Sequence, residues 1–186
     1  MEIFFGLVLL LIAGAVVLLF AMLGELSSRL PTERTAPQTA PRTGEIRPLE
    51  EALVGTRPNV WPSSLPPLAE EEDSPRTLLL VLSTVCSTCS SVAKQVSAEL
   101  DQGGGGDLAI VVSTGDRGRA ERFVDDYGLR RLPLHIDENG AWVAGEFGVR
   151  MSPTALIFRQ GKLDSAVIFD DVNAVRELSD ASEGVS

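Results

Sequence analysis

The chain has two cysteines, Cys86 and Cys89, and their spacing of three is the first feature that could support chemistry. Cysteine pairs of this kind serve metal binding, haem attachment or thiol–disulfide exchange. A tetrahedral zinc site needs four ligands, but His135 is the only histidine, so such a site cannot close within one chain. Covalent haem attachment needs a histidine after the second cysteine, where Ser90 stands. The spacing therefore favours redox exchange, and a Cu(I) site completed by His135 or Met151 is the alternative.

The sequence around the pair places it where exchange could proceed. The apolar run 77–83 predicts a strand buried on both faces, and apolar residues at every fourth position of 92–100 predict a helix that begins at the cysteines. Cys86 would lie at the helix N-terminus, where free backbone N–H groups and the positive end of the helix dipole stabilise a thiolate. Cys89, on the inward face, would attack the mixed disulfide formed at Cys86. A purely structural disulfide is disfavoured, because so short a loop constrains little of the unfolded chain.

Alternating strand and helix signals continue beyond this helix. The glycines at 103–106 end it as a flexible loop, and no Lys-Ser or Lys-Thr pair follows that would make a phosphate-binding loop. Gln160-Gly161 predicts a hairpin between the last two strands. The chain is therefore expected to form an α/β domain with a mixed central sheet flanked by helices. Further strands are predicted at 108–112, 134–136, 154–158 and 163–169, and further helices at 116–127, 140–147 and 171–178.

A second motif lies at 147–158, where Pro153 stands immediately before an apolar strand. Together with the strand–CSTC–helix pattern and Ile136-Asp137-x-x-Gly140, this motif resembles the thioredoxin superfamily over residues 76–180. Within the superfamily, the chain is similar to membrane-tethered bacterial redox proteins of the cytochrome-maturation and methylamine-utilisation types. The resemblance implies a thioredoxin-like fold for this part of the chain.

The resemblance also assigns roles to individual residues. It implies a cis peptide bond before Pro153, facing the cysteine pair, and a Ser152 backbone that pairs with a partner peptide as an added strand. Met151 and Arg150 are expected to line the substrate groove. The implied activity is that of a thiol–disulfide oxidoreductase, which exchanges the Cys86–Cys89 dithiol with protein thiols and disulfides. It would use this redox-active disulfide without a separate cofactor or metal.

Three features depart from the superfamily pattern. Val85 replaces the usual aromatic residue before the first cysteine, and Ser87-Thr88 replaces a proline-containing dipeptide between the cysteines. In thioredoxin itself, a buried acid that helps to deprotonate the second cysteine stands where this chain has Leu80. The departures favour an oxidant and a reductant equally. They also motivate an alternative function, a redox-silent binding or assembly module.

A membrane anchor is predicted within 1–25. Residues 3–23 form a run of 21 without a charged side chain, and as a helix this run spans roughly 30 Å, the thickness of a bilayer core. A cleaved signal peptide is the alternative, but Glu2 stands where basic residues would be expected. The sequence therefore predicts attachment to the membrane through a single helix over 3–23.

A tether is predicted to connect this anchor to the domain at 76–180. Nine of the eleven prolines lie in 31–75, and the composition of 26–75 offers little that could be buried together. Val60-Trp61 is the one candidate within the tether for packing on the domain. Residues 181–186 are expected to form a tail.

The net charge of −10 and the lack of a basic patch disfavour nucleic acid as a partner. Three arginines follow the predicted span, at 29, 34 and 42, and by the positive-inside rule they would place the C-terminal part in the cytoplasm. The family resemblance favours the other side of the membrane, and a dithiol in the cytosol would be kept reduced. We expect a single-pass protein of the cell membrane whose redox domain is extracytoplasmic.

Overall fold

The computed structural model describes residues 4, 6, 44–71, 76–105 and 108–181. The chain divides into two units, Met1–Pro41 and Arg42–Ser186, and both cysteines lie in the second. Among the described residues, no helix has the length and apolar character needed to cross a membrane. The predicted span 3–23 lies outside those residues, except for Phe4 and Gly6.

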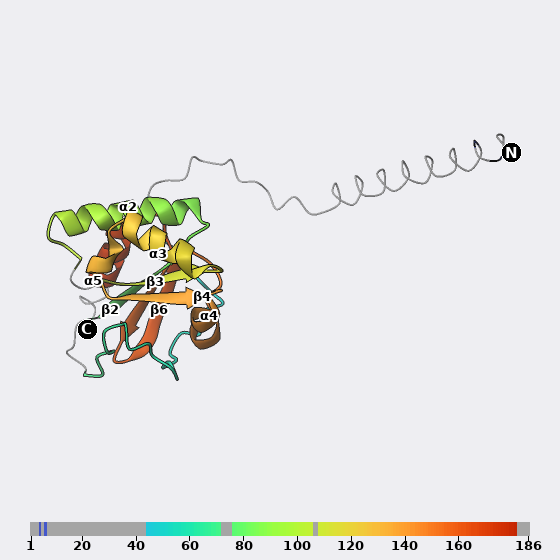
Figure 1. Ribbon diagram of the computed structural model, residues 1–186. Helices are drawn as coiled ribbons and strands as arrows, with labels where there is room; N and C mark the ends of the chain where they lie inside the picture. Colours follow the sequence, from blue (N-terminus) through green and yellow to red (C-terminus); the bar gives the residue numbers. More distant parts are fainter. Residues whose placement is uncertain (1–3, 5, 7–43, 72–75, 106–107, 182–186) are drawn as a thin grey trace. The chain divides into compact units, whose positions relative to one another are not determined.

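A mixed sheet forms the centre of the second unit (Figure 1). It has six strands in the order β1-β6-β5-β2-β3-β4. Strands β2, β3 and β4 are parallel, whereas β5 and β6 are antiparallel to their neighbours. Residues 78–82 of β2 are all buried, as the continuous apolar run predicted. The strands are β1 (Arg47–Pro48), β2 (Thr77–Ser83), β3 (Leu108–Thr114), β4 (Leu134–Glu138), β5 (Thr154–Arg159) and β6 (Lys162–Ile168).

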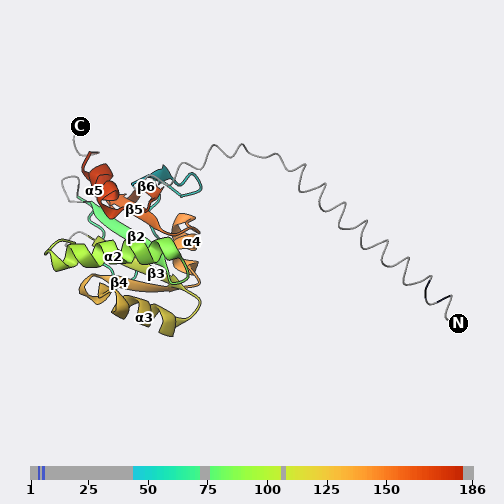
Figure 2. The ribbon, with the colours of Figure 1, turned by 90° about the horizontal axis from the view of Figure 1, so that it is seen from above.

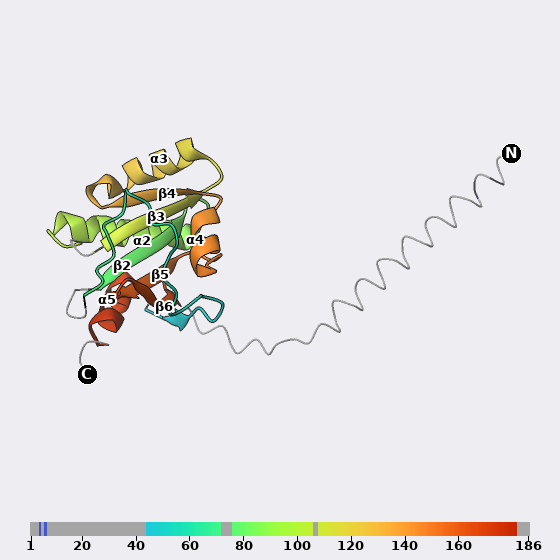
Figure 3. The ribbon, with the colours of Figure 1, turned by 90° about the horizontal axis from the view of Figure 1, so that it is seen from below.

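Helices cover both faces of the sheet. Three of them, α2 (Ser87–Asp101), α3 (Arg117–Asp126) and α5 (Val172–Ala181), pack on one face (Figure 2). The short helix α4 (Ala141–Phe147) packs on the opposite face, and the segment 44–71 runs beside it (Figure 3). The predicted α/β class, with a mixed central sheet flanked by helices, is therefore confirmed.

Capping side chains explain why α3 and α5 begin one residue later than predicted. Asp116 is the N-cap of α3 rather than part of the helix, and its carboxylate accepts a hydrogen bond from the Arg119 N–H at 3.2 Å. The carboxylate of Asp171 likewise accepts from the Asn173 N–H at 2.9 Å, at the start of α5. The predicted hairpin is present, and Gln160 and Gly161 both have positive φ, as a two-residue hairpin turn requires.

The prediction of a tether over 26–75 is wrong for 44–71, which belongs to the folded unit. Strand β1 pairs with β6, and Leu49 and Leu65 are buried in the core on the α4 side of the sheet. The Leu53 N–H donates to the carbonyl of Phe147 at 2.9 Å, which fixes the segment to the end of α4. Pro48 is tolerated in β1 because this strand lies at the edge of the sheet, where a missing N–H costs no ladder hydrogen bond.

Trp61 is the main aromatic anchor of this segment. Its ring makes edge contacts with Trp142 and Phe158, at centroid distances of 5.5 and 5.4 Å. Its indole N–H donates to the carbonyl of Pro66 at 2.8 Å, so the polar atom is satisfied. The Trp142 indole N–H donates to the carbonyl of Val60 at 2.8 Å. The predicted docking of Val60-Trp61 on the domain is therefore confirmed.

Replacing Trp61 with Ala should destabilise the folded unit by about 3 kcal/mol, because it leaves a cavity beside Trp142 and Phe158. The matched control is Val60→Ala, at a side chain that is 62% exposed, and it should cost less than about 0.5 kcal/mol. Denaturant unfolding followed by circular dichroism measures both. Equal effects of the two substitutions would show that the Trp61 indole does not anchor the segment.

Candidate active site

Cys86 stands at the start of α2, immediately beyond the central strand. It is the N-cap of the helix, and its Sγ accepts a hydrogen bond from the Cys89 backbone N–H at 3.2 Å. Its own N–H donates to the carbonyl of Ser83 at 3.3 Å. The side chain is half-buried, so the sulfur is within reach of a partner. A backbone N–H directed at a sulfur stabilises negative charge on it, which is what an attacking thiolate requires.

Cys89 lies on the inward side of α2 and is fully buried, as the helical periodicity predicted. Burial, followed by its hydrogen bond with Cys86, raises the pKa of the Cys89 thiol to about 12. Hydrogen bonds from the Ser83 backbone and the Ser152 side chain act in the opposite direction but do not reverse the shift. Both cysteines are free thiols in this structure. The dithiol therefore has one accessible sulfur and one shielded, protonated sulfur.

The loop before β5 faces the cysteine pair. The Cys86 thiol donates to the carbonyl of Ser152 at 3.5 Å, and the Ser152–Pro153 peptide bond is cis. Pro153 is buried, whereas Met151 is 48% exposed beside it. The Thr154 hydroxyl donates to the Met151 carbonyl at 2.8 Å and holds the loop in shape. The structure thus places Met151, Ser152 and Pro153 in the loop that faces Cys86 and Cys89, as the sequence predicted.

Asp137 is the only buried carboxylate among the described residues, and it does not serve the cysteines. Its two oxygens accept hydrogen bonds from the N–H groups of Trp142 and Val143, at 2.9 and 3.0 Å, and so cap α4. Leu80, fully buried in β2, stands at the position for which the comparison with thioredoxin itself predicted the loss of a buried acid. The described part of the chain therefore offers no buried acid to take the proton of Cys89.

His135 lies in β4, away from the cysteine pair. Its ring packs on Trp142 with centroids 5.4 Å apart, and its Nδ1 is 3.4 Å from the hydroxyl of Ser64. Burial lowers its pKa, and the charge of Asp137 opposes that shift. Where the structure describes the chain, no three His, Cys, Asp or Glu side chains are placed to hold a metal. A Cu(I) site formed by both cysteines and His135 is therefore not assembled.

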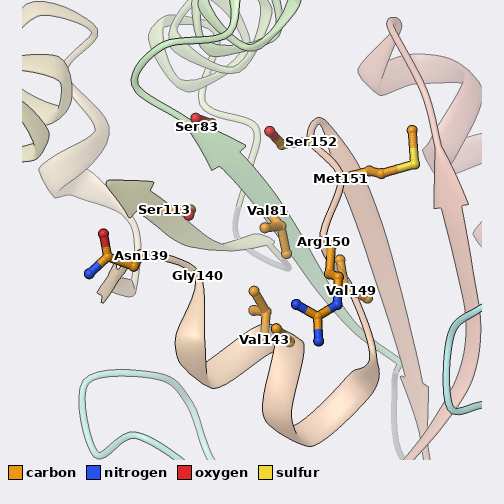
Figure 4. A pocket seen from close by; sticks show the side chains of 11 residues that line it. Val81, Ser83, Ser113, Asn139, Gly140, Val143, Val149, Arg150, Met151 and Ser152 are labelled. Atoms are coloured by element: carbon orange, nitrogen blue, oxygen red, sulfur yellow. The ribbon is translucent and has the colours of Figure 1, made fainter. Parts of the chain in front are cut away.

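A cavity of about 290 Å³ opens beside the Ser152 loop, at the carboxyl ends of β2 and β3 (Figure 4). Its lining includes Ser83, Ser113, Asn139 and Ser152, and the side chain of Arg150 lies over α4 at its edge. The sequence predicted only the contributions of Ser152, Met151 and Arg150. Ligands of open α/β sheets bind beyond the carboxyl ends of parallel strands, and this rule could have pointed to the serines.

No protein-family model and no curated protein sequence matches the chain. Its structure is similar to that of a secreted Mycobacterium tuberculosis disulfide oxidoreductase described as homologous to DsbE of E. coli. The two are 20% identical, the match covers 60% of this chain and 82% of that one, and the TM-score is 0.43. It is also similar to StoA from Bacillus subtilis, with 17% identity, 58% and 82% coverage and a TM-score of 0.45.

A third similar structure is the N-terminal domain of PilB from Neisseria gonorrhoeae. It is 17% identical, the match covers 62% of this chain and 80% of that domain, and the TM-score is 0.47. At such identities and scores, the activities of these proteins do not carry over to this chain. The chemistry of the site rests on its own geometry.

A brief treatment of the reduced protein with iodoacetamide at pH 8 should modify Cys86 and spare Cys89. With a pKa of about 12, the Cys89 thiolate fraction at that pH is on the order of 1 in 10,000. Its modification should rise about tenfold per pH unit as the pH approaches 12. Peptide mass spectrometry measures both sites, and denatured protein, which should label both equally, is the control. Comparable labelling of the two in native protein at pH 8 would contradict the assignment.

Proposed function

We propose that the protein is a thioredoxin-like thiol–disulfide oxidoreductase that exchanges its Cys86–Cys89 dithiol with protein thiols and disulfides. The observation that carries the proposal is the difference in accessibility between the two sulfurs. Cys86 is reachable and accepts the Cys89 N–H at 3.2 Å, whereas Cys89 is fully buried behind it. The Ser152 carbonyl, 3.5 Å from the Cys86 sulfur, supplies a backbone group beside the attacking atom.

In the reducing direction, the Cys86 thiolate attacks one sulfur of a partner disulfide. A bond forms between Cys86 and that sulfur, the partner's S–S bond breaks, and the other partner sulfur leaves as a thiolate. Cys89 then loses its proton and attacks Cys86, which forms the Cys86–Cys89 disulfide and releases the second partner sulfur. The dithiol loses two electrons, the partner gains them, and the two protons pass to the leaving thiolates. The oxidising direction reverses these steps.

We further propose that a helix over 3–23 tethers the protein to the cell membrane, with the redox domain on the extracytoplasmic side. The 21-residue run without charged side chains supports the tether, because its length as a helix matches a bilayer core. Only outside the reducing cytosol could the pair persist as a disulfide and act as an oxidant. Protease accessibility of the domain in intact cells and in lysed cells tests the orientation.

A redox-silent binding module is the second candidate function. Leu80 leaves Cys89 without an acid that could take its proton, and the high pKa of Cys89 slows the resolving step. Val85, 76% exposed, and Met151, 48% exposed, flank Cys86 and offer apolar contacts to a partner. These features favour tight partner contact with slow turnover.

Titration of the full-length protein against glutathione should reveal a single two-electron transition of the Cys86–Cys89 pair. The expected slope is about 30 mV for each tenfold change in the ratio of oxidised to reduced protein. A potential near about −270 mV would indicate a reductant, and one near about −120 mV an oxidant. Thiol trapping followed by mass spectrometry gives the reduced fraction. The lack of a cooperative transition would contradict exchange and support the binding module.

Single serine substitutions should separate the roles of the two cysteines. Cys89→Ser should accumulate a mixed disulfide through Cys86, because no second sulfur remains to resolve it. Cys86→Ser should lose exchange almost entirely, because the remaining sulfur is buried. Non-reducing gels with a protein disulfide substrate measure both. Trapping through Cys89 in the Cys86→Ser variant would overturn the assignment of the attacking residue.

A further inference from the structure

The cavity beside the Ser152 loop has polar side chains without partners inside the protein. The Ser113 hydroxyl, the Asn139 amide and the Arg150 guanidinium make no hydrogen bond or ion pair with any residue that the structure describes. By contrast, the Asp137 carboxylate close by is fully engaged as the cap of α4. Asn139 and Arg150 are exposed at the rim of the cavity, and polar groups without internal partners at such a rim are available to a ligand.

The charge of the cavity lining is positive. Arg150 is its only charged lining residue, and none of the lining residues is acidic. The N–H groups at the start of α4 are occupied by Asp137, so the helix end does not contribute. Val81, Val143 and Val149 make the floor apolar, which suits a short aliphatic stem (Figure 4). The lining therefore matches a carboxylate on a few methylene groups, with Arg150 as its ion-pair partner.

Two residues connect this cavity directly to the attacking sulfur. Ser152 lines the cavity, and its carbonyl accepts the hydrogen bond of the Cys86 thiol at 3.5 Å. Ser83 also lines the cavity, and its carbonyl accepts the Cys86 N–H at 3.3 Å. A substituent in the cavity would therefore belong to the same molecule whose sulfur meets Cys86. With about 290 Å³, the cavity has room for a group of side-chain size.

We propose that this cavity binds a carboxylate carried next to the reacting sulfur of the thiol or disulfide substrate, and that Arg150 determines this specificity. The inference rests on the proposed exchange function and adds its substrate class. It runs against the overall charge of −10, which attracts cations and repels anions. A preference for anionic substrates therefore has to come from the cavity itself, because the net charge of the protein would produce the opposite preference.

The test uses three small disulfides of different charge with the reduced full-length protein. They are 3,3′-dithiodipropionate, which is anionic, 2-hydroxyethyl disulfide, which is neutral, and cystamine, which is cationic. The rate constant for oxidation of the Cys86–Cys89 dithiol by each is divided by the rate constant for dithiothreitol with the same disulfide. This ratio removes the intrinsic reactivity of the probe. At low salt, the anionic probe should exceed the cationic probe by about tenfold in the normalised rate constant.

Arg150→Gln should remove this preference and let the cationic probe become the faster one, as the net charge alone would dictate. Arg150→Lys should retain part of it, because it keeps the charge but not the planar fork. Lys162→Gln is the matched control, because it removes one positive charge at the opposite end of the sheet, where β5 turns into β6. The control should keep the anionic preference of the unmodified chain.

Equal normalised rate constants for the three probes in the unmodified chain would overturn the carboxylate site and leave the exchange function standing. A preference that survives Arg150→Gln would also overturn it. Failure of all three disulfides to oxidise the dithiol would overturn both the site and the exchange function. If Arg150→Gln alters the circular dichroism spectrum, Ser113→Ala is tested in its place. This variant should reduce the ratio of the anionic to the cationic rate constant.

Discussion

Burial of β2 on both faces is the constraint on which the site depends. Residues 78–82 contact cores on both sides of the sheet, which holds the strand in place, and Cys86 follows its last residue by three positions. The antiparallel pairing with β5 sets Val81 opposite Thr154 and so delivers the Ser152–Pro153 loop to the same edge. The short contact between the Cys86 sulfur and the Ser152 carbonyl is thus a consequence of strand register.

The same placement divides the chemistry between two sulfurs that are only three residues apart. One turn of helix carries the chain from the solvent-facing N-cap to the core, where Cys89 packs with Val92 and Val96. Burial favours the neutral form of a thiol and so keeps Cys89 protonated. Cys86, by contrast, has a backbone N–H directed at its sulfur.

The parts of the structure that were predicted correctly from the sequence are those that follow from local periodicity. The run 77–83, the inward face that includes Cys89 and the turn at Gln160-Gly161 all depend on neighbouring residues, and the structure has each of them. The segment 44–71 has no period, because its few apolar anchors are separated by prolines and polar residues. In the structure this segment passes close to Gly148, where φ is +72° and a Cβ would lie 2.7 Å from the carbonyl of Glu51. Of the cavity lining, only the loop residues Arg150, Met151 and Ser152 were predicted, because the others come from strands and turns far apart in sequence.

The segment that was predicted to be a tether shapes the site through α4. Gly140, Val143 and Ala144 of that helix region form one wall of the cavity beside Ser152. The helix is held in turn by the segment, through the Leu53 N–H on the Phe147 carbonyl and the Asn59 N–H on the Glu146 carboxylate at 2.7 Å. A fragment that began at residue 76 would keep both cysteines and the Ser152 loop but lose these supports. The segment 44–71 therefore supports the helix that lines the cavity, and the rest of the predicted tether lies outside the described residues.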